Sequence, residues 1–482
     1  MFRRFDLFSM FVLIVMFAIP AGTITAPLSE YDTGWHLRTG QWIVENRAIP
    51  EADTFSTVGQ DRLWVAYSWL YDVGVYGAFQ TLGLVGILLC RTALALFIVM
   101  ALYFLVRRRE PSVVVQAGIV AAASVALWPL LVSDRPGLVS MIFVIWTLEA
   151  ILALREGRAH GKIWLLPLVY ALWANVHIQW VHGLFIMGLA WLAPLIDAAV
   201  ARRSLTVAER RDWLKLTALI AACSLATLCN PYHIHLYDVV LTYAQQKEMY
   251  QRFEELKSIA FRQPADWFVL GLTCAACFAL GRRQKLDTFD MLLLLAGCYF
   301  SFHARHDTWF VVLAACVILS RRAGSVSDRS APACLPHWSC ILLLAASVLT
   351  ARFFLHGISD DRLQTEQAHE FPVAAAEFLE NSGLPGPIFN SIDWGGYLIW
   401  RLPHYQVGID GRAQLHGEQR TRRCMDVCEG RPGWSDDPEL RGAGVVLLQK
   451  NAPLAELLRR DPRWRQVHTS DIAVVFALSG RN

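Results

Sequence analysis

Charged side chains are scarce in this sequence, and the scarcity excludes whole classes of protein. Asp, Glu, Lys and Arg make up 18% of the 482 residues, whereas a soluble globular chain carries about 25%. Hydrophobic residues reach 55%, and the mean hydropathy is +0.36. These values exclude a disordered chain and argue against a soluble enzyme. A formal net charge of +3 is also too small for a nucleic-acid-binding domain built on a basic face.

Metal-binding cysteine patterns are missing as well. The 11 cysteines include no pair of Cys-x-x-Cys units and no His/Cys array, which argues against a structural zinc site. Most of them fall in apolar stretches, where a small apolar side chain suffices. Cys424 and Cys428 lie in the polar tail, and their spacing fits either a disulfide or a helix face with two free thiols.

Long apolar runs, by contrast, recur along the first three quarters of the chain. The run 7–25 follows Arg3 and Arg4, a start that a cleaved signal peptide shares, but its length and Pro27 favour an uncleaved anchor. Further runs occupy 82–106, 112–132, 136–154, 163–178, 181–200, 213–229, 266–281, 288–303, 307–320 and 338–355. We therefore predict an α-helical polytopic membrane protein with about eleven spans.

The distribution of Lys and Arg predicts how these spans are oriented. Connections that carry a cluster of Lys and Arg alternate with connections that contain fewer of these residues. The clusters lie at Arg3/Arg4, Arg107–Arg109, Arg155/Arg158/Lys162, Arg202/Arg203/Arg210/Arg211/Lys215, Arg282/Arg283/Lys285 and Arg321/Arg322/Arg329. Because such clusters stay on the cytoplasmic side, we expect a cytoplasmic amino terminus and an extracytoplasmic carboxyl-terminal domain in the plasma membrane. The predicted domains are a membrane domain, 1–357, and an outer domain, 358–482.

Two soluble-looking segments are expected on the outer side. The first outer loop, about 27–80, contains two amphipathic pieces, 35–46 and 67–79, that we expect to lie on the membrane surface, because a second span here would break the charge alternation. The tail alternates short strand-like runs with helical patterns, which predicts a small α/β sheet. Its strands are expected at 387–391, 406–410, 445–449, 465–469 and 472–478, and its helices at 369–381, 396–401 and 453–459.

Polar residues gather at the predicted outer ends of the spans. They are Asp32, His36 and Arg38; Asp134 and Arg135; Asn175, His177, Gln179 and His182; Asn230, Tyr232, His233 and His235; and His303, Arg305, His306 and Asp307. Ionisable groups near the hydrocarbon boundary are costly and often mark a cavity, although any one of them is also explained as a wetted loop residue. Because five connections share this polarity, we predict a polar cavity.

The residue types in this cavity suit an anionic substrate. Arginine binds phosphate through two parallel hydrogen bonds, and histidine both donates and accepts. The predicted contacts to a phosphate or substrate are His36, Arg38, Arg135, His177, Arg305 and His306, with Asn175 as a secondary candidate. Asp32 is the predicted catalytic residue, because a carboxylate beside the membrane can take a proton from an incoming hydroxyl. Asp53 is a second acidic candidate, or alternatively a helix or turn cap.

The first loop carries a family resemblance. Asp32, Trp35-His36-Leu37-Arg38, Gly40, Ile49-Pro50 and Asp53 stand in the order found in the first outer loop of GT-C membrane glycosyltransferases. This resemblance implies many spans, a catalytic acid in that loop, surface helices and a polyprenyl-phosphate-linked sugar donor. The loop departs from some GT-C families in having no paired acidic dipeptide, which leaves Asp32 alone in the role.

The whole chain resembles, more closely, a group of bacterial multi-span proteins of undefined activity near the GT-C enzymes. The matching segments are Asp134-Arg135-Pro136, Trp173-Ala174-Asn175-Val176-His177, Asn230-Pro231-Tyr232, Asp393-Trp394-Gly395-Gly396-Tyr397-Leu398 and Asp410-Gly411-Arg412. Trp394–Tyr397 suits either contact with a sugar or lipid, or a tight strand-to-helix turn. Asp410 and Arg412 suit a turn with a local ion pair, or the lining of the cavity.

We therefore expect a glycosyltransferase that moves a sugar from a polyprenyl-phosphate donor to an acceptor on the outer face of the membrane. Its partners are the bilayer and the lipid-linked sugar, with no nucleic acid, and a divalent cation at Asp32 is the alternative to proton transfer. Two other classes remain open: a transporter or lipid-handling protein, and a non-catalytic GT-C-like scaffold. Glu149 and Asp197, within or near spans, keep the transporter alternative open.

Overall fold

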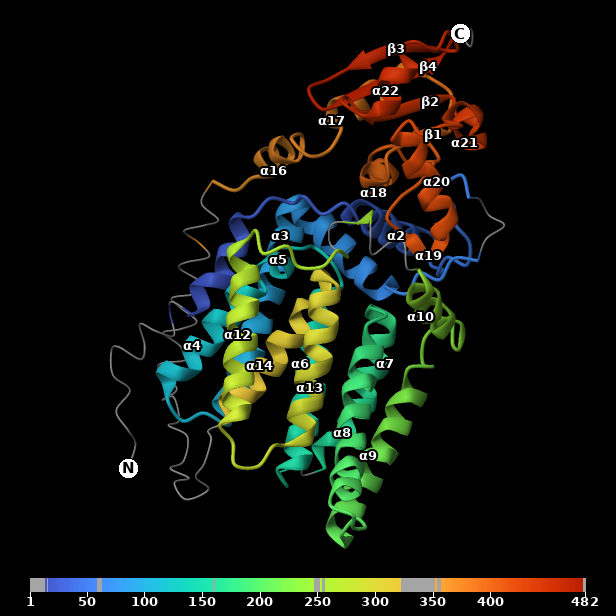
Figure 1. The fold of residues 1–482 in the computed structure, drawn as a ribbon. Helices are drawn as coiled ribbons and strands as arrows, with labels where there is room; N and C mark the ends of the chain where they lie inside the picture. Colours follow the sequence, from blue (N-terminus) through green and yellow to red (C-terminus); the bar gives the residue numbers. More distant parts are fainter. Residues whose placement is uncertain are drawn as a thin grey trace. The chain divides into compact units, whose positions relative to one another are not determined.

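The computed structural model shows a mostly helical chain that divides into two compact units (Figure 1). It describes residues 14, 16–58, 63–158, 161–246, 252–253, 256–321, 352 and 357–479. Unit 1 comprises 1–26, 89–233 and 250–357, and unit 2 comprises 27–88, 234–249 and 358–482. The predicted first outer loop and the predicted outer domain thus belong to one compact unit.

Unit 1 is a helical bundle. It contains the second part of α3 (Trp69–Arg107), α4 (Val113–Ala126), α5 (Trp128–Leu131), α6 (Gly137–Arg155), α7 (Leu166–Val176), α8 (Trp180–Val200), α9 (Val207–Ala226), α12 (Pro264–Gly281), α13 (Thr288–His303) and α14 (Thr308–Ser320). Helices α12 and α13 pack on α14, α4 packs on α12 and α14, and α8 packs on α6, α9 and α13. These helices follow the predicted apolar runs closely.

Four helices among the described residues are long and apolar enough to cross a membrane, judged by length and composition. They are α3, α6, α8 and α12. Helices α4, α7 and α13 are apolar but shorter. The chain is therefore a multi-pass membrane protein, while the count of about eleven spans stays a prediction. The start of the predicted span 7–25 and nearly all of 338–355 lie outside the described residues.

Four of the arginine clusters used to predict orientation, those near 107–109, 155–158, 282–285 and 321, meet at one end of unit 1. Glu149 of α6 accepts from Arg108 and Arg109, and Glu156 accepts from Arg109. Arg321 pairs with Glu156 at 3.4 Å. A second set joins the ends of α6 and α14 to the start of α13, through Arg155–Asp287 at 2.8 Å, Arg283–Asp290 at 2.7 Å and Arg321–Asp290 at 2.9 Å. Their connections therefore share one side of the bundle, as the charge alternation predicts.

Unit 2 begins with the segment that the sequence marks as the first outer loop. Helix α2 (Thr33–Asn46) matches the predicted piece 35–46, and α3 starts at Trp69, near the second piece. Helix α3 is interrupted at Gly83, whose φ of 63° is left-handed. The break lies where the sequence separates 67–79 from the span 82–106. Asp360 lies against Gly83 and accepts from the Val85 amide at 3.1 Å.

The carboxyl-terminal part of unit 2 holds a small four-stranded sheet. Its strands β1 (Ile388–Asn390), β2 (Val445–Gln449), β3 (Trp464–Thr469) and β4 (Ala473–Leu478) have the order β1-β2-β4-β3, with β1 and β2 parallel and the other pairs antiparallel. The accompanying helices are α16 (Asp360–Gln367), α17 (Val373–Ser382), α18 (Ile392–Arg401), α19 (Ala413–His416), α20 (Glu418–Cys428), α21 (Pro438–Gly442) and α22 (Pro453–Leu458). Buried side chains from β2, β4, α21 and α22 form its core. The predicted small α/β fold is confirmed.

One predicted strand, 406–410, is wrong as a strand. Val407 makes only isolated parallel bridges, to Ile388 on one side and Ser56 on the other. The Val407 amide donates to Phe55 O at 3.1 Å, and the Thr57 amide donates to Val407 O at 2.9 Å. The pairing stops because Ile409 and Asp410 turn away toward α18, where Gly395 lies against their backbone. The first loop therefore pairs with the tail at the edge of the sheet.

Candidate functional site

Asp32 stands at the start of α2, in unit 2. It occupies the position before the first helical residue but makes no capping bond to the helix backbone. Instead, the indole Nε1 of Trp35, one turn later, donates to Asp32 Oδ1 at 3.0 Å. Asp32 is half-buried. The Trp35 indole therefore holds one oxygen of the carboxylate that the sequence singles out as catalytic.

A turn of the tail closes on this carboxylate. A Cβ atom at Gly411 would lie 1.9 Å from Asp32 Oδ1, so any larger residue there would push the carboxylate out of this position. Nearby, a Cβ at Gly34 would lie 2.2 Å from Gly396 O, and one at Gly396 would lie 2.3 Å from Tyr31 O. Helices α2 and α18 thus cross at backbone contact. Both glycines of Trp394–Tyr397 lie inside α18 rather than in a strand-to-helix turn: Gly396 serves this helix packing, and Gly395 lies against the backbone of Ile409 and Asp410.

His36 packs against Trp35. Its ring stacks on the Trp35 ring at a centroid distance of 3.6 Å, and its Nδ1 lies 2.6 Å from Asp72 Oδ1 of α3. Both His36 and Asp72 are buried. Arg38, the other predicted phosphate contact in α2, donates to Gln41 at 2.8 Å. His36 therefore contacts a buried carboxylate and an indole, and its predicted contact with phosphate stays a prediction.

Asp53, Asp410 and Arg412 form a buried cluster. Arg412 donates to Asp53 Oδ1 at 2.8 Å and to both oxygens of Asp410, at 2.8 and 2.7 Å. Its guanidinium lies 4.6 Å from the Trp64 ring centroid and 5.4 Å from that of Phe55. All three charged side chains have zero exposure. The local Asp410–Arg412 ion pair suggested by the sequence is present, and these groups are enclosed by protein rather than lining a cavity.

Asp53 has the surroundings of a structural carboxylate. It accepts from the amides of Phe55 and Ser56, both at 3.1 Å, as an Asx turn does. Burial alone would raise the pKa of the Asp410 carboxyl, but the charge of Arg412, with His416, holds it well below its ordinary value. The cluster therefore joins the first loop to the tail across 359 positions of sequence.

The cluster extends to three residues that the sequence analysis did not select. His416 Nε2 lies 3.0 Å from Asp410 Oδ2, and Arg420 donates to His416 Nδ1 at 2.9 Å and to Glu439. Because a guanidinium only donates, Nδ1 accepts from Arg420, while Nε2 lies within reach of both the Asp410 carboxylate and the Asp410 amide, which is 3.3 Å away. The four-residue spacing of 412, 416 and 420 is the signal that could have identified His416 and Arg420, whereas no local signal marks Glu439.

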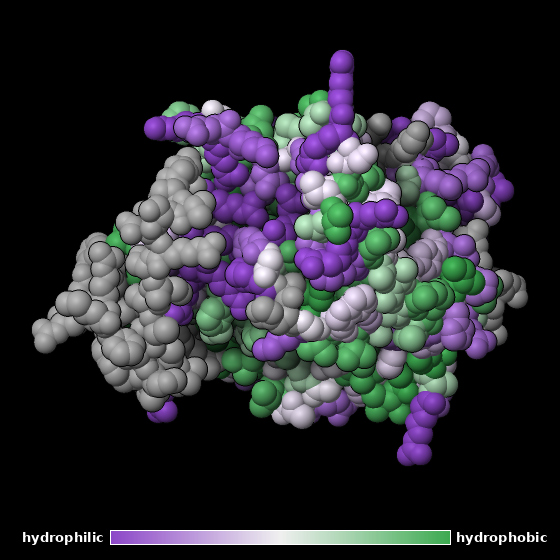
Figure 2. Space-filling model, turned by 90° about the horizontal axis from the view of Figure 1, so that it is seen from below, coloured by the Kyte–Doolittle hydropathy of each residue, from purple (hydrophilic) through white to green (hydrophobic). Residues whose placement is uncertain are grey.

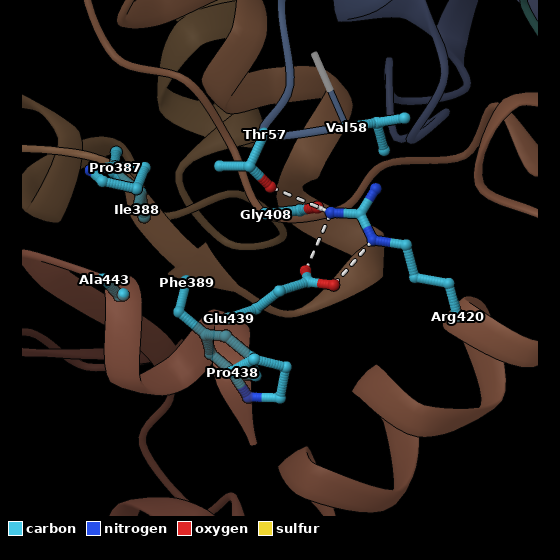
Figure 3. A pocket seen from close by; sticks show the side chains of 11 residues that line it. Thr57, Val58, Pro387, Ile388, Phe389, Gly408, Arg420, Pro438, Glu439 and Ala443 are labelled. Atoms are coloured by element: carbon cyan, nitrogen blue, oxygen red, sulfur yellow. Dashed lines mark hydrogen bonds and ion pairs between the residues drawn. The ribbon is translucent and has the colours of Figure 1, made fainter. Parts of the chain in front are cut away.

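A pocket of about 410 Å³ opens beside Arg420 in unit 2 (Figure 3). Its lining includes Thr57, Phe389, Gly408 and Glu439. Arg420 donates to Thr57 Oγ1 at 2.9 Å, to Gly408 O at 2.6 Å and to both Glu439 oxygens at 2.8 Å. Its guanidinium is thus committed to protein groups and offers little charge to a ligand, so we assign the pocket no function.

The remaining predicted site residues belong to unit 1. Ser140 Oγ of α6 lies 2.8 Å from His177 Nδ1 and accepts from Trp173 Nε1 at 2.8 Å. Asn175 donates to Ala171 O and Cys229 O, each at 2.7 Å. Arg135 precedes α6. The ends of α6 and α7 therefore meet through polar groups.

The connection between α13 and α14 adds a second polar group to unit 1. Arg305 pairs with Asp266 of α12 at 3.5 Å, and His306 Nδ1 lies 3.5 Å from Asp307 Oδ1. The His182 ring at the start of α8 lies 5.4 Å from that of Trp309, which brings this connection beside the segment that follows His177. Polar residues of several connections thus share one end of unit 1.

The structure also bears on the predicted metal ion and on the two cysteines of the tail. Over the described ranges, no group of three or more His, Cys, Asp or Glu side chains is placed to hold a metal ion. The divalent cation proposed for Asp32 therefore stays a prediction, and no step below depends on it. Cys424 and Cys428 both lie in α20 as free thiols, as the second of the two readings of their spacing predicts.

Comparison with known proteins identifies the fold. Arabinofuranosyltransferase AftD from Mycobacteria superposes with a TM-score of 0.56 and 15% identity over 100% of this chain and 41% of that chain. The Archaeoglobus fulgidus oligosaccharyltransferase superposes with a TM-score of 0.52 and 8% identity over 91% of this chain and 69% of that chain. ArnT from Cupriavidus metallidurans, bound to undecaprenyl phosphate, gives a TM-score of 0.47 at 12% identity over 98% and 97% of the two chains.

Sequence comparisons add no relative: no family model matches the chain, and no curated protein matches it significantly. The chain spans less than half the length of AftD. At these identities the superpositions define architecture, and they agree with the resemblance carried by the first loop. The chain is a helical, multi-pass membrane protein with a GT-C-like fold and a small α/β domain near its carboxyl terminus.

Proposed function

We propose that this protein is a membrane glycosyltransferase that moves a sugar from a polyprenyl-phosphate donor to a hydroxyl acceptor. The single observation that carries the proposal is the placement of Asp32: a carboxylate at the start of α2, oriented by Trp35 and closed in by the glycine at 411. The GT-C-like fold and the membrane-spanning helices support it. The lipid-linked donor follows from the resemblance of the first loop.

In the proposed reaction, the acceptor oxygen attacks the anomeric carbon and its proton passes to the Asp32 carboxylate. The bond from the anomeric carbon to the phosphate oxygen breaks, and polyprenyl phosphate leaves with the electron pair. One displacement inverts the configuration of the anomeric carbon. General-base catalysis of this kind contributes about 10²–10⁴-fold to a rate.

Trp35 has a specific part in this step. Its indole N–H stabilises a negative charge on Asp32 Oδ1 and restricts rotation of the carboxylate. The stacked His36 ring, held by Asp72, fixes the indole in turn. Arg135, His177, Arg305 and His306 remain the predicted contacts of the leaving phosphate, and the charge bias of the connections supports an outer active face.

The test compares membrane lipids and envelope glycans of a deletion strain complemented with the wild-type gene, with Asp32→Asn or with Asp471→Asn. Asp471 is an exposed carboxylate of the same unit and provides the matched control. One polyprenyl-linked sugar should accumulate in the deletion and Asp32→Asn strains and return to its normal level in the other two. Unchanged lipids and glycans in the deletion strain would refute the enzyme, and full rescue by Asp32→Asn would refute the role of Asp32.

A further inference from the structure

Most of the basic clusters at one end of unit 1 are neutralised by the protein itself. Glu149, Glu156, Asp287 and Asp290 pair with arginines that follow α3, α6, α12 and α14. These ion pairs neutralise much of the positive charge that the sequence concentrates on that side. The connection between α8 and α9 departs from this pattern.

The start of α9 carries more cations than carboxylates. Arg203 and Glu209 neutralise each other through bonds of 2.7 and 2.8 Å. Asp212 is shared by Arg211 and Lys215 at 3.5 Å each, a distance that gives little attraction at an exposed site. Arg210 is exposed. The helix therefore begins with an excess of uncompensated positive charge.

These cations line a shallow groove of about 480 Å³ together with apolar side chains. Arg210, Arg211 and Lys215 of α9 form one wall with Leu214, and Trp164, which precedes α7, forms the other. Trp164 is 47% exposed and Leu214 51% exposed. Figure 2 views the molecule from this end of unit 1, where hydrophilic and hydrophobic residues lie side by side.

We infer that this groove binds the phosphate headgroup of an anionic phospholipid. Three cations suit the phosphate, and the exposed indole and leucine suit the glycerol backbone and the first acyl carbons. Tryptophan prefers this depth of a bilayer, between headgroup and hydrocarbon. The flanking helices α7 and α9 are packed together; α7 is apolar up to Asn175, and α9 carries no charged residue beyond Lys215, so a lipid seated here has its chains beside the bundle.

The groove is separate from the predicted phosphate contacts of α7, Asn175 and His177, in the same unit. It lies at the starts of α7 and α9, whereas Asn175 and His177 lie at the end of α7. Eleven helical residues separate the two ends of α7, or roughly 16 Å at 1.5 Å per residue. A phosphate held in the groove therefore cannot contact Asn175 or His177 at the same time, and the inference stands independently of the proposed function.

The experiment is native mass spectrometry of the purified full-length chain, incubated with equal amounts of phosphatidylglycerol and phosphatidylethanolamine in mild detergent. The test variant is Arg210→Gln with Lys215→Gln. The control, Arg282→Gln with Lys285→Gln, removes two exposed cations from the α12–α13 connection. Each cation near an anionic lipid contributes about fivefold, so the test variant should bind phosphatidylglycerol roughly 30-fold more weakly, with the control close to wild type.

Trp164→Ala supplies a second measurement that does not change charge, and it should weaken phosphatidylglycerol binding severalfold. Inorganic phosphate at millimolar concentration should not displace the lipid, because it lacks the apolar part. Equal losses in the test and control variants would mean that net charge alone attracts the lipid and would overturn the site. Wild-type binding without preference for phosphatidylglycerol, or displacement by phosphate, would also overturn it.

Discussion

Replacing Arg412 with methionine tests the buried cluster that joins the first loop to the tail. The guanidinium neutralises Asp53 and Asp410, and none of the three side chains reaches solvent. Methionine keeps an apolar stem but removes the guanidinium that lies over the Trp64 and Phe55 rings, and it leaves two buried carboxylates without their arginine partner. Breaking a buried pair in this way costs about 3–5 kcal/mol.

The loss of stability is best measured in the two backbone segments that the cluster joins. In hydrogen–deuterium exchange, peptides covering residues 55–57 and 407–412, whose backbone the cluster holds, should exchange about 10²–10⁴-fold faster in Arg412→Met than in wild type, at about 1.4 kcal/mol per factor of ten. The control is Arg401→Met, which breaks the exposed pair with Glu380 and should cost less than about 1 kcal/mol. Exchange of the Arg412→Met peptides within threefold of wild type would refute the reasoning.

The variant should also respond to pH in a characteristic direction. In wild type the folded pKa of Asp410 is depressed, so its stabilisation is present above its unfolded pKa and is lost only as the pH falls below about 4. Without Arg412, burial dominates and the folded pKa lies above the unfolded one. The native state then binds more protons, and Arg412→Met should regain stability as the pH falls from 7 to 5, whereas wild type should not.

Three further predictions concern single positions. Gly411→Ala places a Cβ 1.9 Å from the present position of Asp32 Oδ1. Because the carboxylate is then displaced, the rate of sugar transfer should fall by about 100-fold. Unchanged turnover would contradict the proposed closure of the turn on Asp32. Trp35→Phe keeps an aromatic ring but removes the donor to Asp32, so turnover should fall by about 10- to 100-fold. Because Trp35 is buried, the smaller ring should also lower thermal stability moderately, and complete loss of folding would make Trp35 merely structural. Burial raises the pKa of the Cys424 thiol, and it raises the pKa of the Cys428 thiol to about 12. Peptide mapping should therefore find both cysteines unmodified by iodoacetamide at pH 8 until the chain unfolds. Modification of the native protein would show that α20 opens.

Local patterns predicted much of the fold. The apolar runs anticipated helices such as α6 and α8, and the β-branched runs near 445 and 472 anticipated β2 and β4, because each signal is contained within its own segment. The strand expected at 406–410 failed, since its partners lie at 55–57 and 388 and only one residue reaches both. Whether a short run pairs depends on neighbours that the run does not encode.

The site shows the same division between local and distant signals. The ion pair of Asp410 with Arg412 was readable from a separation of two residues. The share of Asp53 in that pair was not, because it depends on folding the first loop onto the tail. The crossing of Gly34 and Gly396 was equally hidden, since each glycine taken alone suggests only a turn.

The most direct test of the proposed catalysis uses the lipid that accumulates in the deletion strain. That lipid, purified and added to wild-type protein in nanodiscs with an envelope extract as acceptor, should be consumed, releasing polyprenyl phosphate and a product of inverted anomeric configuration. Asp32→Asn should consume it at least 100-fold more slowly, and Asp471→Asn at the wild-type rate. Consumption by Asp32→Asn at the wild-type rate, or a product with retained configuration, would contradict the account.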